Sequence, residues 1–132
     1  MTPLAVLFDF EGVIADTANH HIAAWQRTLL AMGWQVPDEV AAKAAEQDDT
    51  EFLTELFAKH ELNDGDVAGW VKKKQDLTLQ MLHDSPRVYG GVVSLVKSLK
   101  GKVRLGVVST AWRQNIEASL IETGLKDAFD VI

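Results

Sequence analysis

The sequence contains no cysteine, so it can form neither disulfide bonds nor thiolate metal sites. It also lacks any stretch near the roughly 20 apolar residues that a membrane-spanning helix needs. The apolar run at the N-terminus is interrupted by Asp9, which is too early for a signal peptide. We therefore expect a cytoplasmic protein without a membrane partner.

Basic residues are scarce as well. The 13 lysines and arginines are outnumbered by 19 aspartates and glutamates, which gives a net charge of −6. Nucleic-acid binding depends on neutralising phosphates, so this balance predicts no nucleic-acid partner. Hydrophobic residues make up 47% of the chain, which is enough for a packed core and excludes general disorder.

Three short apolar runs predict β-strands. They cover residues 4–8 and 103–108, and a third begins at 129–132. Such nearly continuous runs are typical of strands in a parallel sheet that is covered on both faces. A helical stripe, Val92, Leu95, Val96 and Leu99, precedes the second run. Another, Ile116, Leu120 and Ile121, lies between the second and third runs, with Gly124 as a helix-ending residue of positive φ. The alternation predicts a Rossmann-like α/β core.

The long segment between the first two runs is different, because its periodicity is helical throughout. Its stripes are Ile22, Trp25, Leu29 and Met32, then Phe52, Leu53, Leu56 and Phe57, then Val67, Trp70, Leu77 and Met81. Gly33 is expected to end the first helix, while Asp38 and Asn63–Asp64 are expected as N-caps. We therefore predict a core of residues 1–15 and 86–132, interrupted after its first strand by a helical cap of residues 16–85.

Two carboxylates follow the first predicted strand. Asp9 and Glu11 stand where open α/β sheets usually bind ligands, beyond the carboxyl end of a strand. An aspartate there can attack phosphorus or bind Mg²⁺, and a nearby acid can exchange protons. The simpler alternative is a solvated acidic turn.

A hydroxyl pair, Ser109-Thr110, follows the second long run, shortly before a predicted helix. Hydroxyls and backbone N–H groups near a helix N-terminus can hold an anion such as phosphate. The alternative is ordinary N-capping, which serine and threonine also perform.

Together these motifs resemble the haloacid dehalogenase-like (HAD) hydrolase superfamily, over essentially the whole chain. The matching features are Asp9-x-Glu11-Gly12-Val13, the all-helical insert, Tyr89-Gly90-Gly91-Val92 and Val107-Val108-Ser109-Thr110. The run Asp16-Thr17-Ala18-Asn19-His20-His21, followed by Ala24-Trp25, is similar to the β-phosphoglucomutase-like subgroup.

The resemblance implies a Mg²⁺-dependent phosphatase that acts on a small phosphorylated metabolite through an aspartyl phosphate. Asp9 would be the nucleophile and a metal ligand, and Glu11 would be the acid/base and offer its backbone carbonyl to the metal. Ser109 and the Thr110 amide would hold the phosphoryl group. His21 matches a histidine at the junction of cap and core, although a surface imidazole near a hinge is an equal interpretation.

Two substitutions depart from the family pattern. Position 11 is glutamate where the phosphatases have aspartate, which suggests altered or slow turnover. The stretch Glu46-Gln47-Asp48-Asp49 replaces a Gly-x-x-Arg motif that grips a sugar phosphate, so a mutase acting on hexose phosphates is not expected. These acids alternatively cap a helix that starts near Thr50.

The sequence ends at Ile132, before the lysine and second acidic metal-binding pair that the family carries on later strands. Lys126 precedes the third run and stands in the wrong place to substitute. We therefore expect the C-terminal strands of the core to be missing from this chain. An open apolar edge on the first strand would favour self-association. The alternative function is a catalytically impaired or non-catalytic HAD-like module.

Overall fold

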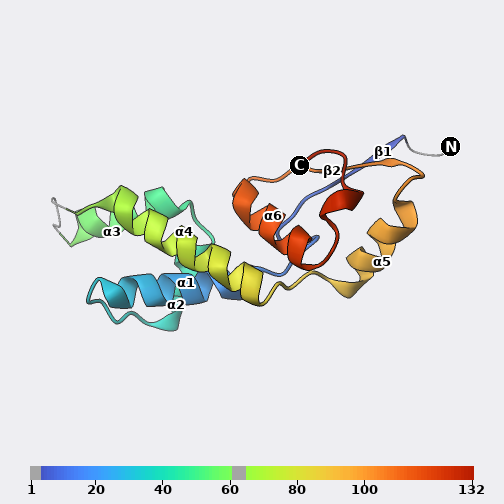
Figure 1. Cartoon of the computed structure of the whole chain (residues 1–132). Coiled ribbons are helices and arrows are strands. Elements are labelled where there is room, and N and C mark those ends of the chain that lie inside the picture. Colours follow the sequence, from blue (N-terminus) through green and yellow to red (C-terminus); the bar gives the residue numbers. More distant parts are fainter. Residues whose placement is uncertain (1–3, 61–64) are drawn as a thin grey trace. The chain divides into compact units, whose positions relative to one another are not determined.

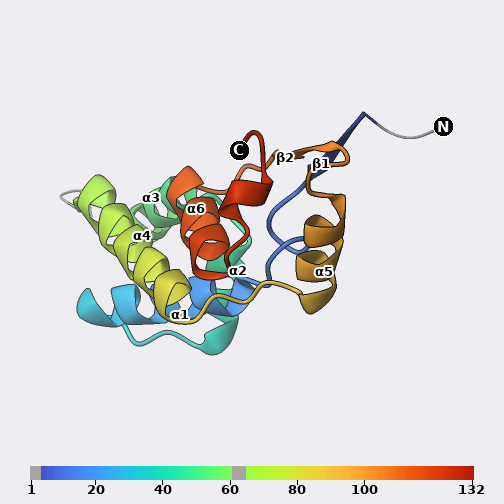
Figure 2. The same ribbon diagram turned by 45° about the vertical axis from the view of Figure 1, so that its right-hand side comes forward.

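The computed structural model describes residues 4–60 and 65–132, which form two compact units (Figures 1 and 2). The first unit contains Met1–Thr17 and Leu79–Ile132, and the second contains Ala18–Thr78. The described part of the chain has no helix long and apolar enough to cross a membrane.

The first unit is built on a parallel strand pair. Its elements are β1 (Ala5–Phe8), α5 (Gly90–Leu99), β2 (Arg104–Val107), α6 (Arg113–Glu122) and the short 3₁₀ helix η1 (Lys126–Ala128). Phe8 is opposite Val107 in the register, and a parallel bridge joins Gly106 to Val131 on the other side of β2. The predicted α/β fold with a parallel sheet is confirmed, although the third run contributes only this bridge.

Among the described residues, one face of β1 is covered and the other is exposed. Val6 and Phe8 pack into the core, whereas Leu7, which points the opposite way, is 65% exposed. The order of the paired segments across the sheet is β1, β2 and then Val131. Connections between parallel strands are right-handed, so α5 and α6 lie on the same face of the sheet. Both helices lie below the strands in Figures 1 and 2. The expectation of a strand covered on both faces is therefore wrong for β1, whereas three consecutive residues of β2, Leu105, Gly106 and Val107, are buried.

The helical stripes of this unit are narrower than predicted. Val96, Ile116 and Leu120 are buried in the core, but Leu95 and Ile121 are about half exposed. Ile121 lies five residues after Ile116, which is about 140° around a helix of 3.6 residues per turn. Its inclusion in the buried stripe was therefore wrong.

The second unit is all-helical. It contains α1 (Ala18–Ala31), α2 (Asp38–Ala45), α3 (Asp49–Lys59) and most of α4 (Val67–Asp84), whose last residues belong to the first unit. Trp25 is fully buried, and its ring makes an edge contact with Phe52 at 4.9 Å between centroids. Leu29 and Leu53 are also completely buried in this core. The predicted stripes of α1 and α3 therefore meet inside the unit. The predicted stripe of α4 is displaced, because the buried residues of that helix are Val71, Lys74, Thr78 and Leu82, whereas Leu77 and Met81 are only partly buried.

Some of the helix ends that the sequence predicts are found in the structure, and others are not. Gly33 ends α1 with a φ of 90°, as predicted. Asp38 is the first residue of α2 and accepts a hydrogen bond from Gln26 at 2.9 Å, so it is not the predicted N-cap. Asp48 caps α3 by accepting from the Glu51 amide at 2.9 Å. The predicted cap at Asn63–Asp64 lies outside the described residues.

Candidate functional site

The loop after β1 turns sharply around one buried side chain. Phe10 is fully buried, and its carbonyl accepts hydrogen bonds from the amides of Val13, Ile14 and Ala15 at 3.2, 2.8 and 3.0 Å. The residues on either side of Phe10, Asp9 and Glu11, are exposed. The buried ring therefore anchors the loop while the two carboxylates reach solvent.

Gly12 gives this loop its shape, because its φ is 77°. A Cβ atom added there would meet nothing within 4 Å, so a substitution would cost only backbone strain. We expect Gly12→Ala to lower the free energy of unfolding by about 1–2 kcal/mol, measured by chemical denaturation.

Gly91→Ala is a matched control, because that glycine is helical and an added Cβ also meets nothing within 4 Å. It should leave stability unchanged or raise it by up to about 1 kcal/mol. An equal effect of the two substitutions would contradict the assignment of strain to Gly12.

The two carboxylates of the loop have partners close by in the first unit. An Oδ1 of Asp9 accepts from the amide of Phe10 at 2.6 Å. The Thr17 hydroxyl donates to Glu11 Oε1 at 3.3 Å. Both contacts leave the carboxylates on the exposed side of the loop, where an ion or ligand can approach.

The predicted phosphate-binding pair lies in the turn between β2 and α6. Ser109 Oγ accepts from the amide of Ala111 at 3.0 Å, which stabilises this turn. Helix α6 starts only at Arg113, and the residue before it, Trp112, makes no side-chain cap. The alternative that Ser109 and Thr110 are plain N-caps is therefore wrong.

The strand pairing brings the two loops to one edge of the sheet. The Val108 amide donates to the Phe8 carbonyl at 2.9 Å, one step beyond the last paired residues of β1 and β2. Asp9 and Ser109 therefore leave neighbouring parallel strands at their carboxyl ends. This is the edge where open α/β sheets bind ligands.

The carboxylate oxygens at this edge are of the type that binds Mg²⁺. Mg²⁺ prefers oxygen ligands and is usually held by one or two carboxylates, with waters and substrate phosphate oxygens completing its shell. Asp9 and Glu11 supply such oxygens. Among residues 4–60 and 65–132, however, no three His, Asp or Glu side chains gather closely enough to form a metal site.

The described residues form two surface hollows. One of about 360 Å³ lies in the second unit and is lined by Val40, Phe52 and Leu56, among others. The other, of about 420 Å³, is lined by Lys102, Arg104 and neighbours at the amino end of β2. Neither is lined by the predicted site residues.

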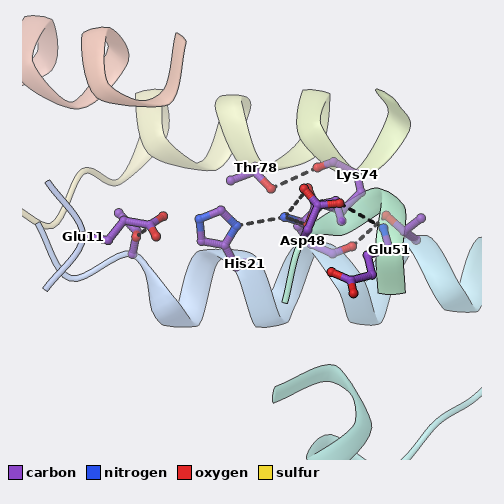
Figure 3. Close-up of polar contacts among 10 residues, drawn as sticks. Glu11, His21, Asp48, Glu51, Lys74 and Thr78 are labelled. Carbon is purple, nitrogen blue, oxygen red and sulfur yellow. Dashed lines mark hydrogen bonds and ion pairs between the residues drawn. The ribbon is translucent and has the colours of Figure 1, made fainter. Parts of the chain in front are cut away.

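His21, the other predicted site residue, lies on α1 in the second unit and contacts a lysine. Its Nδ1 is 2.9 Å from Nζ of Lys74 on α4 (Figure 3). Lys74 is only 1% exposed, and both carboxylate oxygens of Asp49 accept from it at 3.0 Å. A half-buried imidazole beside an ammonium is not the surface histidine of the simpler interpretation.

The sequence interpretation missed Lys74, although a signal for it exists. The apolar stripe of α4 runs through Val67, Trp70, Leu77 and Met81, and Lys74 occupies the position between Trp70 and Leu77 in the same 3–4 spacing. A charged residue inside an apolar stripe is buried with a partner or it breaks the stripe. The partner, Asp49, could not be identified from spacing, because it is 25 residues away.

The sequence model described as haloacid dehalogenase-like hydrolase matches residues 6–132. The fold is similar to the crystal structure of CbbY from Rhodobacter sphaeroides in complex with phosphate, with a TM-score of 0.80 and 24% identity. That comparison covers 99% of this chain and 63% of CbbY. A mutant of CbbY crystallised with xylulose-(1,5)bisphosphate matches at 25% identity, a TM-score of 0.78 and the same coverage.

A β-phosphoglucomutase from Clostridium difficile is also similar, with a TM-score of 0.73, 21% identity and coverage of 99% of this chain and 61% of that one. The chain thus spans less than two thirds of the length of these structures. Because the family model covers nearly the whole sequence, the chain belongs to the haloacid dehalogenase-like hydrolase family.

Proposed function

We propose that this chain carries the nucleophile and phosphate-binding groups of a Mg²⁺-dependent phosphatase that acts on a small phosphorylated metabolite. The observation that carries the proposal is the position of Asp9 and Ser109 at the carboxyl ends of two directly paired parallel strands. Family membership, and structures of similar fold that hold phosphate or a sugar bisphosphate, support the choice of phosphoryl transfer.

In the proposed reaction, a carboxylate oxygen of Asp9 attacks the phosphorus and the ester P–O bond breaks. Glu11 gives its proton to the departing oxygen, which leaves as an alcohol. Glu11 then takes a proton from water, the water oxygen attacks the aspartyl phosphate, and phosphate is released with Asp9 restored. Bound Mg²⁺, which the Asp9 carboxylate and the Glu11 backbone carbonyl would hold, would neutralise charge on the phosphoryl oxygens.

Ser109 and Thr110 are proposed to orient the transferring group. The Ser109 hydroxyl lies in the turn after β2, and the backbone amide of Thr110 follows it. Neutral donors of this kind hold phosphoryl oxygens without adding charge. Helical residues 16–85 are proposed to act as a cap, with His21 as its substrate-contacting residue.

The test is release of inorganic phosphate from a generic ester such as p-nitrophenyl phosphate, with and without Mg²⁺. We expect Mg²⁺-dependent turnover by the purified chain. Mass spectrometry of acid-quenched enzyme should find a phosphoryl group on the peptide that contains Asp9. Turnover without any modification of that peptide would contradict the covalent route.

Glu11→Asp is expected to raise kcat by up to about 100-fold. The extra methylene of glutamate moves the carboxyl group by about 1.5 Å, and misplacing a catalytic group by about 1 Å can cost about 100-fold in rate. Glu11→Gln, which keeps the length but cannot exchange the proton, should instead lose activity. Equal rates for the wild type and Glu11→Asp would mean that Glu11 already has a productive position.

A second candidate is a non-catalytic HAD-like module. It is favoured by the lack of three clustered metal-binding side chains in residues 4–60 and 65–132. It is also favoured by the exposed apolar side chains of Leu4 and Leu7 beside β1, which would support self-association. This candidate predicts weak Mg²⁺ binding in calorimetry and a stable oligomer in light scattering. A monomer with measurable turnover would exclude it.

A further inference from the structure

One surface hollow of the second unit has the size of a small-molecule site. It measures about 360 Å³, and concave sites for small molecules start at about 300 Å³. Helix α2, helix α3 and the linker between them form its lining. The residues that α3 contributes are three or four positions apart and therefore share one face of that helix: Phe52, Glu55, Leu56 and Lys59.

The apolar part of this lining is packed from behind. Phe52 is only 8% exposed, and its ring makes the edge contact with the buried Trp25. Val40 and Leu56 are partly buried against the same core, and both line the hollow. An apolar ligand group that covers these side chains removes apolar surface from water without first having to order it.

Charges of both signs surround the apolar surface. Glu39 and Lys43 stand one turn apart on α2, and Glu55 and Lys59 stand one turn apart on α3. All four side chains are exposed. The spacing allows ion pairs within each helix, but among residues 4–60 and 65–132 none of the four forms one. Because the two lysines and two glutamates cancel, a ligand of a single charge meets a like charge as well as an opposite one.

Gln47, in the linker, adds a neutral polar group. Its Nε2 donates to Oε2 of Glu55 at 3.1 Å, and neither side chain has another hydrogen bond within the described part of the chain. A carboxylate has about four lone-pair sites, so Glu55 can accept further hydrogen bonds. An ammonium has three donors, which the Glu55 carboxylate and the Gln47 carbonyl oxygen can accept. The hollow therefore has acceptors for an ammonium and, at its lysines, donors for a carboxylate.

We propose that this hollow binds a small zwitterion with an apolar body, of the class of the apolar α-amino acids. The ligand carboxylate accepts from Lys43, which is four residues before Gln47. The ligand ammonium donates to Glu55 and Gln47, and the apolar body covers Phe52 and Leu56. All these residues belong to the second unit, so the inference is independent of the proposed function.

The test is a titration of the ¹⁵N-labelled full chain with L-phenylalanine, followed through the amide chemical shifts. We expect saturable shifts in α2 and α3, with a dissociation constant on the order of 1 mM or below. Three analogues each remove one part of the ligand: 3-phenylpropanoate lacks the ammonium, 2-phenylethylamine lacks the carboxylate and glycine lacks the apolar body. The first two should bind about three- to tenfold more weakly, and glycine at least about tenfold more weakly.

Variants of the protein test the same contacts. Lys43→Met and Glu55→Gln each remove one charge and keep the side-chain length, so each should weaken binding of L-phenylalanine by about three- to tenfold. Lys72→Met and Glu51→Gln are the matched controls, because they remove the same charges from exposed positions of the second unit that do not line the hollow. They should leave the dissociation constant within about twofold.

The possible outcomes separate this site from other kinds of binding. Binding of 3-phenylpropanoate as tight as that of L-phenylalanine would identify an anion site and overturn the zwitterion assignment. The proposal would also be overturned by equal losses in the lining variants and their controls, or by no saturable shift in α2 and α3 at about 10 mM ligand. Phosphate release is not the readout, so a failure here is distinguishable from a failure of the proposed function.

Discussion

Asp9→Asn is expected to abolish phosphate release, with a fall in kcat on the order of 10⁴-fold or more, as for other covalent nucleophiles. An amide oxygen is a poor nucleophile, so no aspartyl phosphate forms and no later step can follow. The side chain is exposed, and its hydrogen bond to the Phe10 amide can be accepted by an amide oxygen as well. Structure should therefore survive the change, as circular dichroism can verify.

Asp127→Asn is the control for this loss. Asp127 is an exposed carboxylate in η1 of the same unit, and it lines the hollow at the amino end of β2. The same loss of one negative charge there should leave turnover within about twofold, because a distant exposed charge is screened by salt. Comparable activity in Asp9→Asn and the wild type would eliminate Asp9 as the nucleophile and, with it, the proposed reaction.

The strand pair could be predicted from the sequence because its signal is local. A short apolar run that ends in polar residues is a strand pattern, and residues 4–8 and 103–108 both show it. The glycines that end helices could also be predicted from the local sequence. Gly33 and Gly124 have φ values of 90° and 71°, which other residues adopt only at a cost.

Coverage of the sheet could not be predicted in the same way. Leu7 belongs to an apolar run, but whether its face is covered depends on where the connecting helices cross, which no local pattern contains. Ile121 shows the same limitation on a helix, since apolar character alone did not separate it from the buried Leu120.

Helix starts were partly predictable. Several acids near a helix start compete for the cap, and local sequence does not show which carboxylate turns toward the amides. Asp48 turns inward as the cap of α3, while Asp49 reaches Lys74. The sequence favours either a helix cap or a repulsive acidic patch for Glu46–Asp49. The cap is confirmed at Asp48, and Asp49 forms an ion pair with the buried Lys74.

The position of the candidate site could be predicted from the sequence, but the reactivity of its residues could not. Strand ends place Asp9 and Ser109 at one edge, and that inference needed only the strand pattern and parallel pairing. The reactivity of a carboxylate depends on its neighbours in space, which spacing does not define. The catalytic and phosphate-binding roles of these residues therefore remain predictions that the kinetic variants test.

Lys74→Met is expected to lower the free energy of unfolding of the second unit by about 3–5 kcal/mol. Methionine fills a similar volume, so little packing is lost. The cost arises because Asp49, whose side chain is 15% exposed, keeps its negative charge without its partner. His21 also loses its contact at Nδ1. Denaturant unfolding followed by tryptophan fluorescence measures this loss.

Trp112→Phe is a suitable background, because Trp112 is half exposed and its removal leaves Trp25, Trp34 and Trp70, which all belong to the second unit. In that background, Asp49→Leu added to Lys74→Met should recover most of the lost stability, since an apolar pair has no charge to desolvate. Lys73→Met, which removes an exposed lysine 5.1 Å from the Trp70 ring, should cost no more than about 1 kcal/mol. If Lys74→Met were as mild as Lys73→Met, the ammonium of Lys74 would be hydrated in solution and not buried beside Asp49.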